Sequence, residues 1–381
     1  MGLSAAGAGA RARDAATAYT NPAGMTLLEG DHYLFGGYGI VVIQEFEIDP
    51  SGTMSDPPGS TDGGGRTEAL LPGLGSYVVK QIDEDWRLGL AINAPFVGGS
   101  QYDDTWVGRA FVVESNLLGL NFEPSVAYRL DERWSIGLGV NVLYATFESK
   151  RRASTDPAAP TVTLDANDVG FGLTLSTMFE LRPQTRLGLV YRSPIDLELE
   201  GDFDDGAGGK VDAGLEFTLP QGASLSMREE VSSNLSVLAD AGWTDWSVFS
   251  DQATTIGGST LELNRHWEDT WRIGVGAEYR LGERWLLQTG IGYDSSAVPD
   301  QRLLPDIPFQ DSWRYSVGSQ YSFGSWSLGL SYTFMDRGNP NIDSVALPPT
   351  GTVVLDGEFE TSTRHFVGFT ISWHPGSAGR H

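Results

Sequence analysis

The chain has 381 residues, a formal net charge of −25 and no cysteine. Such acidity argues against an extended nucleic-acid surface. The lack of cysteine excludes disulfide scaffolds, thiolate metal sites and thiol nucleophiles. No run approaches the roughly 18 consecutive apolar residues of a membrane helix, but a membrane strand needs only about 10 residues with every second one apolar. The composition therefore leaves a membrane β-barrel open.

The N-terminal residues differ from the rest of the chain. The opening MGLSAAGAGARA has no charged region followed by an apolar one, so we expect that any signal peptide is absent from this sequence. Residues 4–28 are rich in Ala and Gly and show no two-residue alternation, which suits close packing in a confined space. Asn21, Pro22, Ala23 and Gly24 predict a turn. We interpret residues 1–30 as a plug, or hatch; the alternative is a flexible periplasmic tail.

The segment 118–145 contains the pattern that most of the chain repeats. Apolar residues at every second position share one face on both sides of the three-residue turn DER, while Gly, Ser, Asn, Glu and Arg share the other. Alternation of this length predicts two antiparallel strands joined by a hairpin. The small polar face cannot form a dry core, so something other than this chain must cover the apolar face. The simplest cover is lipid.

The same alternation predicts about fourteen strands, the even count of a single-chain outer-membrane barrel. Their connections alternate between short turns and long loops, as expected for the two rims of such a barrel. The predicted strands are 31–48, 69–81, 86–97, 109–130, 134–148, 166–181, 186–200, 213–227, 234–247, 267–281, 285–295, 312–323, 326–337 and 358–373.

Aromatic residues support a membrane environment. Trp86, Trp134, Trp285 and Trp326 each directly follow a short turn. Rings with an apolar body and a polar tip are typical of a bilayer interface. A soluble propeller or solenoid would require a fixed repeat, whereas the loops here vary in length. We predict an all-β transmembrane antiparallel barrel over residues 31–373, with an N-terminal plug in its lumen and a tail at 374–381.

The segment RDAATAYTNPAGM, residues 13–25, resembles the N-terminal hatch of the FadL family of outer-membrane transporters. Further matches follow in chain order: Asn93 to Phe96, Trp106 to Arg109, Pro124 to Tyr128, Tyr191 to Ser193, Trp271 and Arg272, and Tyr293 to Ser295 with Val298 to Asp300. The resemblance covers nearly the whole chain. It implies a fourteen-stranded barrel in the outer membrane of a Gram-negative bacterium, taking up long-chain fatty acids or other hydrophobic compounds.

The family also implies a kink in the third strand and a lateral opening for the ligand. The corresponding residues here are Asn93, Pro95, Phe96, Gly98 and Gly99. Proline lacks a ladder donor and glycine is common where pairing is interrupted, so a wall gap fits this stretch. The alternative is that Pro95 simply ends the strand at the rim.

Several basic residues are candidates for binding a carboxylate. Lys150, Arg151 and Arg152 form the one run of three basic residues, just beyond the fifth predicted strand, and would attract an anion or contact lipopolysaccharide phosphates. Arg265 beside His266 is a second candidate, and Arg192, Arg272 and Arg314 are expected to face the lumen. For such luminal arginines, pairing with acidic residues is the more common role.

Apolar residues in the long loops are candidates for capturing a ligand tail. They are Leu303, Leu304, Ile307, Phe309, Val345 and Leu347, joined by Phe96. They would form an apolar groove, or else pack against one another to hold the loops closed.

We therefore predict a monomeric channel for passive uptake of hydrophobic small molecules, in contact with outer-membrane lipid and lipopolysaccharide. Long-chain fatty acids are the first expectation and aromatic hydrocarbons the alternative. A barrel enzyme such as a lipase is a different class, but no GxSxG motif or calcium-loop spacing is present. A general diffusion porin would not be expected to carry a plug. We expect no enzymatic activity, no cofactor, no metal and no nucleic-acid partner.

Overall fold

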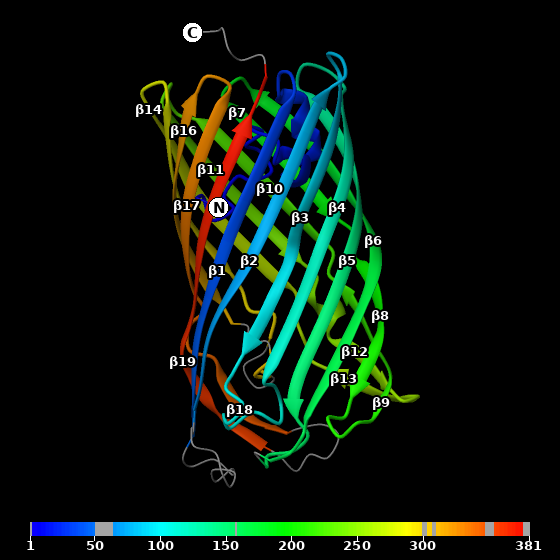
Figure 1. The fold of residues 1–381 in the computed structure, drawn as a ribbon. Coiled ribbons are helices and arrows are strands. Elements are labelled where there is room, and N and C mark those ends of the chain that lie inside the picture. The colour runs from blue at the N-terminus through cyan, green and yellow to red at the C-terminus, as the bar shows by residue number, and fades with distance from the viewer. Residues whose placement is uncertain are drawn as a thin grey trace.

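The computed structural model describes residues 2–49, 64–156, 158–298, 303–306, 310–346 and 354–375. They form a closed antiparallel barrel of 14 wall strands (Figure 1). The barrel closes where β1 (His32–Ile48) pairs with β19 (Val354–Trp373), beginning at Tyr33 opposite Trp373. Within the described residues, no helix is long and apolar enough to span a bilayer. The predicted all-β barrel is confirmed.

The other uninterrupted wall strands are β2 (Gly64–Gln81), β3 (Trp86–Gln101), β4 (Glu114–Arg129), β5 (Trp134–Arg152), β6 (Thr161–Arg182), β15 (Trp285–Asp294), β16 (Ser312–Phe323) and β17 (Trp326–Asp336). Short turns join them at the upper rim in Figure 1, and longer connections lie at the lower rim. The strand β18 (Asn341–Ala346) pairs with β19 among the long connections and does not form part of the wall.

Four wall strands are each interrupted. They consist of β7 (Thr185–Arg192) with β8 (Ile195–Asp204), β9 (Lys210–Leu219) with β10 (Gly222–Glu230), β11 (Leu235–Thr244) with β12 (Asp251–Ile256), and β13 (Ser259–Asn264) with β14 (Thr270–Leu281). We predicted the first two as continuous, whereas β12 and β13 lie at residues that we predicted as a long loop. Pro194 and Pro220 lie at the first two breaks. Proline has no backbone N–H to give to the ladder, so pairing stops there. At the third break the chain forms the 3-10 helix η2 (Trp246–Phe249).

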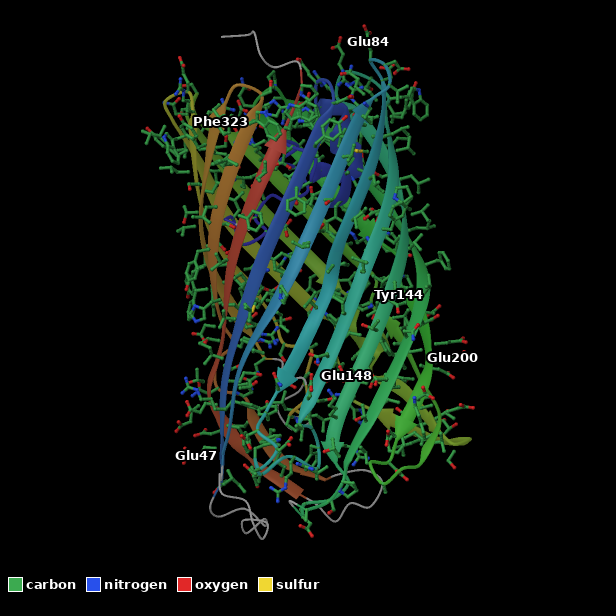
Figure 2. All side chains as sticks on the ribbon, in the orientation of Figure 1. Glu47, Glu84, Tyr144, Glu148, Glu200 and Phe323 are labelled. Atoms are coloured by element: carbon green, nitrogen blue, oxygen red, sulfur yellow. The ribbon has the colours of Figure 1, made fainter. Side chains whose placement is uncertain are left out.

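The outer surface carries the apolar face of the alternation. On β5, Trp134, Ile136 and Leu138 are 41–45% exposed, whereas Ser135 on the opposite face is buried. Figure 2 shows Tyr144 at mid-height on the same outer surface, with Glu84 near the short-turn rim and Glu47 and Glu200 toward the long-connection end. An apolar band flanked by charged ends matches the lipid-facing surface of a membrane barrel.

The tryptophans after the short turns form a ring of aromatic contacts at that rim. The ring centroids of Trp86 and Tyr128 are 4.5 Å apart, and those of Trp134 and Phe179 are 4.4 Å apart. Trp285 and Tyr321 follow at 4.9 Å, and Trp326 and Trp373 at 5.8 Å. These pairs place aromatic rings where a bilayer interface favours them.

The N-terminal segment contains α1 (Thr17–Thr20) and the 3-10 helix η1 (Pro22–Leu27). It meets the inner face of the wall at positions distributed around the barrel, from β3 through β7 to β16. Inward glycines make room for its backbone. A Cβ at Gly137 would lie 2.3 Å from Ala23 N, and a Cβ at Gly188 would lie 2.0 Å from Gly9 O. The segment therefore lies in the lumen, and several wall glycines leave room for it.

We predict that Gly137→Ala displaces the segment around Ala23. The added methyl group overlaps a backbone nitrogen, and overpacking of this kind costs about 1–3 kcal/mol. Proteolysis of the N-terminal segment in the folded barrel should become faster. The matched control is Gly274→Ala, because a Cβ there would meet its nearest atom, Ser4 O, at 3.6 Å. Equal protease resistance in both variants would show that Gly137 is not needed for this contact.

Candidate functional site

The expected turn at Asn21 to Gly24 is anchored to the inner wall by hydrogen bonds. Asn21 is 1% exposed, and its Nδ2 donates to Gly9 O at 2.6 Å and to Thr177 O at 3.1 Å. Ala23 N donates to Ser176 Oγ at 3.0 Å. Pro22 and Gly24 lie in η1, so the turn is the start of a short helix. Each of these bonds joins the hatch to itself or to β6.

A buried carboxylate holds the middle of the hatch. Glu278 is 1% exposed and lies 2.9 Å from Arg13 Nη2, 3.6 Å from Arg11 Nε and 3.9 Å from Arg228 Nε. Burial lowers the pKa of Arg13 to about 10, and the Glu278 carboxylate acts in the opposite direction. Two hatch arginines are thus tied to one wall strand, β14. A second tie runs from Gly9 N to Ser226 Oγ at 3.0 Å.

The wall has an interruption between β2 and β3. Their ladder runs from Gln81 opposite Arg87 to Ser76 opposite Ile92 and then stops. Among the described residues, 68–75 of β2 and 93–100 of β3 form no ladder pairs with each other. Beyond this stretch, Gln101 N donates to Thr67 Oγ1 at 3.2 Å. The gap is therefore bounded at both ends, and we call it the β2–β3 window.

The residues predicted at the kink lie along the β3 side of this window. The register between β3 and β4 shifts between Asn93 and Phe96, so Pro95 lies within the irregularity. Pairing with β4 then continues, with Gly98 opposite Leu117 and Gly99 opposite Asn116. Pro95 therefore does not end the strand, which continues to Gln101.

A cavity of about 500 Å³ lies between the hatch and the wall. The hatch side includes residues 2–6 and 11–14, and the wall side includes Arg314. Tyr38, Tyr77 and Ala94, next to the β2–β3 window, also line it. The cavity therefore extends from the hatch to the interrupted part of the wall.

A large apolar cluster fills the lumen toward the long connections. Its buried members include Phe46, Tyr102, Trp106, Leu143, Leu197, Phe217, Phe249, Trp267, Leu303 and Phe359. Trp106 is fully buried because the chain between β3 and β4 folds inward at residues 102–113. We predicted a strand from residue 109, but β4 begins at Glu114. Phe96 packs against the cluster, so apolar contact continues to the window.

The structure accounts for some of the predicted capture residues. Leu303 is buried in the apolar cluster and Leu304 is half-buried. Val345 lies in β18. Ile307, Phe309 and Leu347 lie outside the described residues.

Most of the predicted basic candidates already contact protein groups. Lys150 lies 2.6 Å from Glu148 and 3.0 Å from Glu114. Arg265 donates two hydrogen bonds to the Asp306 carboxylate, from Nη2 at 2.6 Å and from Nη1 at 3.2 Å. The others behave similarly: Arg152 pairs with Asp104, Arg272 with Asp240, Arg314 with Asp294, and Arg192 lies over the ring of Tyr19. We had predicted that Lys150 to Arg152 lie just beyond the fifth strand. They lie inside it, at the end of β5.

Arg151 differs from its two neighbours. It is paired with Val162 across β5 and β6, and the register puts it on the same inner face as Phe147 and Ala166. Ala166 belongs to the apolar cluster and Phe147 packs against it. Among the described residues, no carboxylate lies within ion-pair distance of Arg151. Arg151 is thus a cation at the edge of the apolar cluster.

A second group of arginines lies deeper in the lumen and was missed in part by sequence reasoning. Arg337 and Arg364 face inward with Arg272 and Arg314, and the acidic groups among them are Asp240 and Asp294. Arg364 has no ion pair within the described part of the chain. Alternation alone could have placed Arg337 and Arg364 inward, because Tyr332 of β17 and Val367 of β19 face outward.

Comparison with known proteins decides the family. Residues 1–365 match the family model described as outer membrane protein transport protein (OMPP1/FadL/TodX). The chain belongs to this family. A long-chain fatty acid transport protein of Salmonella typhi is 27% identical over 372 residues, covering 87% of this chain and 84% of the relative.

Solved structures show the same fold. A FadL homologue of Pseudomonas aeruginosa superposes with a TM-score of 0.89 at 20% identity, covering 98% of this chain and 97% of that one. The Pseudomonas putida toluene transporter TodX superposes with a TM-score of 0.73 at 17% identity, covering 98% and 97%. These superpositions confirm the predicted fold. As a member of the OMPP1/FadL/TodX family, the chain is an outer-membrane transporter of hydrophobic compounds, which confirms the predicted family and location.

We predict that Glu278→Gln loosens the middle of the hatch. The substitution leaves Arg11, Arg13 and Arg228 without their shared carboxylate, and breaking a buried ion pair in this way costs about 3–5 kcal/mol. Hydrogen exchange at residues 11–14 should become faster. Glu283→Gln, in the short turn after β14, is the control for loss of one negative charge. Unchanged exchange in the Glu278 variant would contradict the anchoring role.

Proposed function

We propose that this transporter takes up long-chain fatty acids, that is, amphiphiles with an apolar tail and a carboxylate head. The observation that carries the proposal is the set of inward arginines beside the apolar cluster. Arg272 and Arg314 pair with Asp240 and Asp294, whereas Arg364 and Arg151 have no ion pair within the described residues, and Arg151 lies at the edge of the cluster. An aromatic hydrocarbon would need the apolar surface but not the cations, and it remains the alternative.

The proposed path begins at the long connections. The tail enters the apolar cluster while Arg151 attracts the carboxylate, and the deeper arginines then receive the head group. The curated relative from Salmonella typhi is named as a long-chain fatty acid transport protein, which supports this choice. The cavity of about 500 Å³ leads from Arg314 to the window residues Tyr77 and Ala94.

We propose that the solute leaves sideways through the β2–β3 window into the lipid. Two observations support this exit. The ladder to β3 is missing over residues 68–75 of β2. Within this stretch, the outward residues Leu70 and Leu74 are 68% and 61% exposed. A shift of the hatch around Asn21 to Ala23 would enlarge the cavity on its inner side. The hatch would meanwhile keep the periplasmic end closed.

We further propose that the chain acts by binding and diffusion, without catalysis. Two of its histidines contact a backbone carbonyl and a tyrosine hydroxyl, and not a serine. His32 Nε2 lies 3.0 Å from Glu29 O, and His365 Nδ1 lies 2.8 Å from Tyr332 Oη on an exposed part of the wall. In the described ranges, no group of three or more acidic or histidine side chains is arranged to hold a metal ion.

A head-group role predicts that Arg364→Gln lowers oleate uptake but spares toluene. Loss of a charged hydrogen bond weakens binding roughly tenfold or more. Uptake of each compound is measured in vesicles containing the full-length protein, and Arg151→Gln is tested in parallel. Arg284→Gln, at the exposed short-turn rim, is the control for loss of one positive charge. An equal loss for both compounds would refute the head-group role and favour a hydrocarbon channel.

Lateral release predicts that Pro95→Val slows both compounds. Valine supplies the backbone N–H that proline lacks and favours a regular strand, so pairing between β2 and β3 should extend and narrow the window. Pro124→Val on β4, away from the window, is the control for removing a strand proline. Unchanged uptake rates in Pro95→Val would remove the window as the exit.

A further inference from the structure

Tyr38 of β1 lies across the inner side of the β2–β3 window. In the register of β1 with β2 it is opposite Gly73. A Cβ at Gly73 would lie 2.1 Å from Tyr38 Cζ and 2.4 Å from its Oη. The ring therefore occupies the space that a side chain on β2 would fill. It can reach past β2 toward β3 because residue 73 is glycine.

The hydroxyl of Tyr38 bridges the interrupted part of the wall. Its Oη donates to Ala94 O at 3.2 Å. Ala94 lies in the register shift between Asn93 and Phe96. A side chain from β1 thus binds a β3 carbonyl at a level where β2 forms no ladder pair with β3. This hydrogen bond therefore links β1 to β3 across the interrupted part of the wall.

Tyr77 lies at the other margin of the window. The β2–β3 ladder ends at Ser76, and Tyr77 is the paired residue next to that end. Its Oη lies 2.8 Å from where a Cβ of Gly75 would be. Its ring also packs against an apolar cluster shared by the hatch and the wall, with Ala15, Ala18, Met25 and Leu28 from the hatch and Leu34, Val79 and Ala127 from the wall. Tyr77 therefore lies where this shared cluster meets the edge of the window.

Both rings line the cavity of about 500 Å³ that separates the hatch from this part of the wall. A solute that leaves the cavity through the window passes these rings. Because Gly73 and Gly75 have no side chains, the rings can lie flat along β2 and leave the outer surface to Leu70 and Leu74.

We propose that Tyr38 and Tyr77 form an aromatic shutter that limits the size of the solutes leaving through the window. The Tyr38 bond to Ala94 holds the shutter closed, and the hatch supports Tyr77 from behind. Movement of the hatch removes that support and opens the shutter. This inference rests on the proposed lateral release, and it assigns the selectivity of that step to two wall residues.

The test compares two carboxylates of different width in vesicles containing the full-length protein: oleate, and a fatty acid carrying a terminal pyrene ring. Tyr38→Phe keeps the ring and removes the bond to Ala94, so uptake of both should rise by up to about fivefold, as expected for one neutral hydrogen bond. Tyr38→Ala and Tyr77→Leu widen the opening and should raise the ratio of pyrene-labelled acid to oleate. Tyr191→Phe is the matched control, because it removes a hydroxyl bond to Gln221 on a wall strand away from the window.

The outcomes separate the shutter from the exit. If Pro95→Val slows uptake while Tyr38→Phe, Tyr38→Ala and Tyr77→Leu behave like Tyr191→Phe, the shutter is wrong and lateral release stands. If Pro95→Val has no effect, both proposals fail. Tyr38→Phe is nearly isosteric, so it keeps the test decisive even where Tyr38→Ala does not fold.

Discussion

In the hydrocarbon of a membrane, every backbone N–H and C=O must find a partner within the protein. The closed ladder from β1 round to β19 meets this requirement, and it fixes the direction of each side chain. Apolar residues then face lipid and small polar residues face the lumen. The β2–β3 window is a departure from the ladder, and it is accompanied by side-chain bonds from Tyr38 to Ala94 and between Thr67 and Gln101. An interrupted wall thus remains a wall because side chains replace part of the backbone pairing.

The same alternation determines how the hatch is held. Apolar contact between the hatch and the inner wall is divided between small clusters, such as Leu238 with Leu3 and Ala6, and polar groups share in holding the segment. Glycines such as Gly137 and Gly188 let its backbone approach, and hydroxyl groups such as Ser176 and Ser226 receive its N–H groups. Glu278 is a buried carboxylate of the wall, and its negative charge is balanced by Arg11 and Arg13 of the hatch. Polar contacts of this kind hold a segment in place and still permit it to move.

Sequence reasoning predicted what depends on period-two alternation and failed where other forces act. It gave the barrel, the short-turn tryptophans and the irregularity at Pro95. It missed the breaks at Pro194 and Pro220, because apolar alternation continues through them on either side. It began a strand at Arg109, but β4 begins at Glu114, and the segment before it folds into the lumen, where Trp106 is buried. It singled out Lys150 from its charge, but a carboxylate opposite it on the neighbouring strand, Glu114, already pairs with it. Pairing across strands depends on register, which a single sequence does not display.

The two ends of the luminal cavity present different costs to an apolar solute. Toward the periplasm it would have to separate Arg11 and Arg13 from Glu278, exposing buried charges at a cost of several kcal/mol. Toward the window it meets two tyrosine rings, two glycines and one neutral hydrogen bond, worth about 1 kcal/mol. Aromatic rings also offer the solute favourable contact as it passes. The arrangement of charge within the hatch thus supports the lateral exit that we propose.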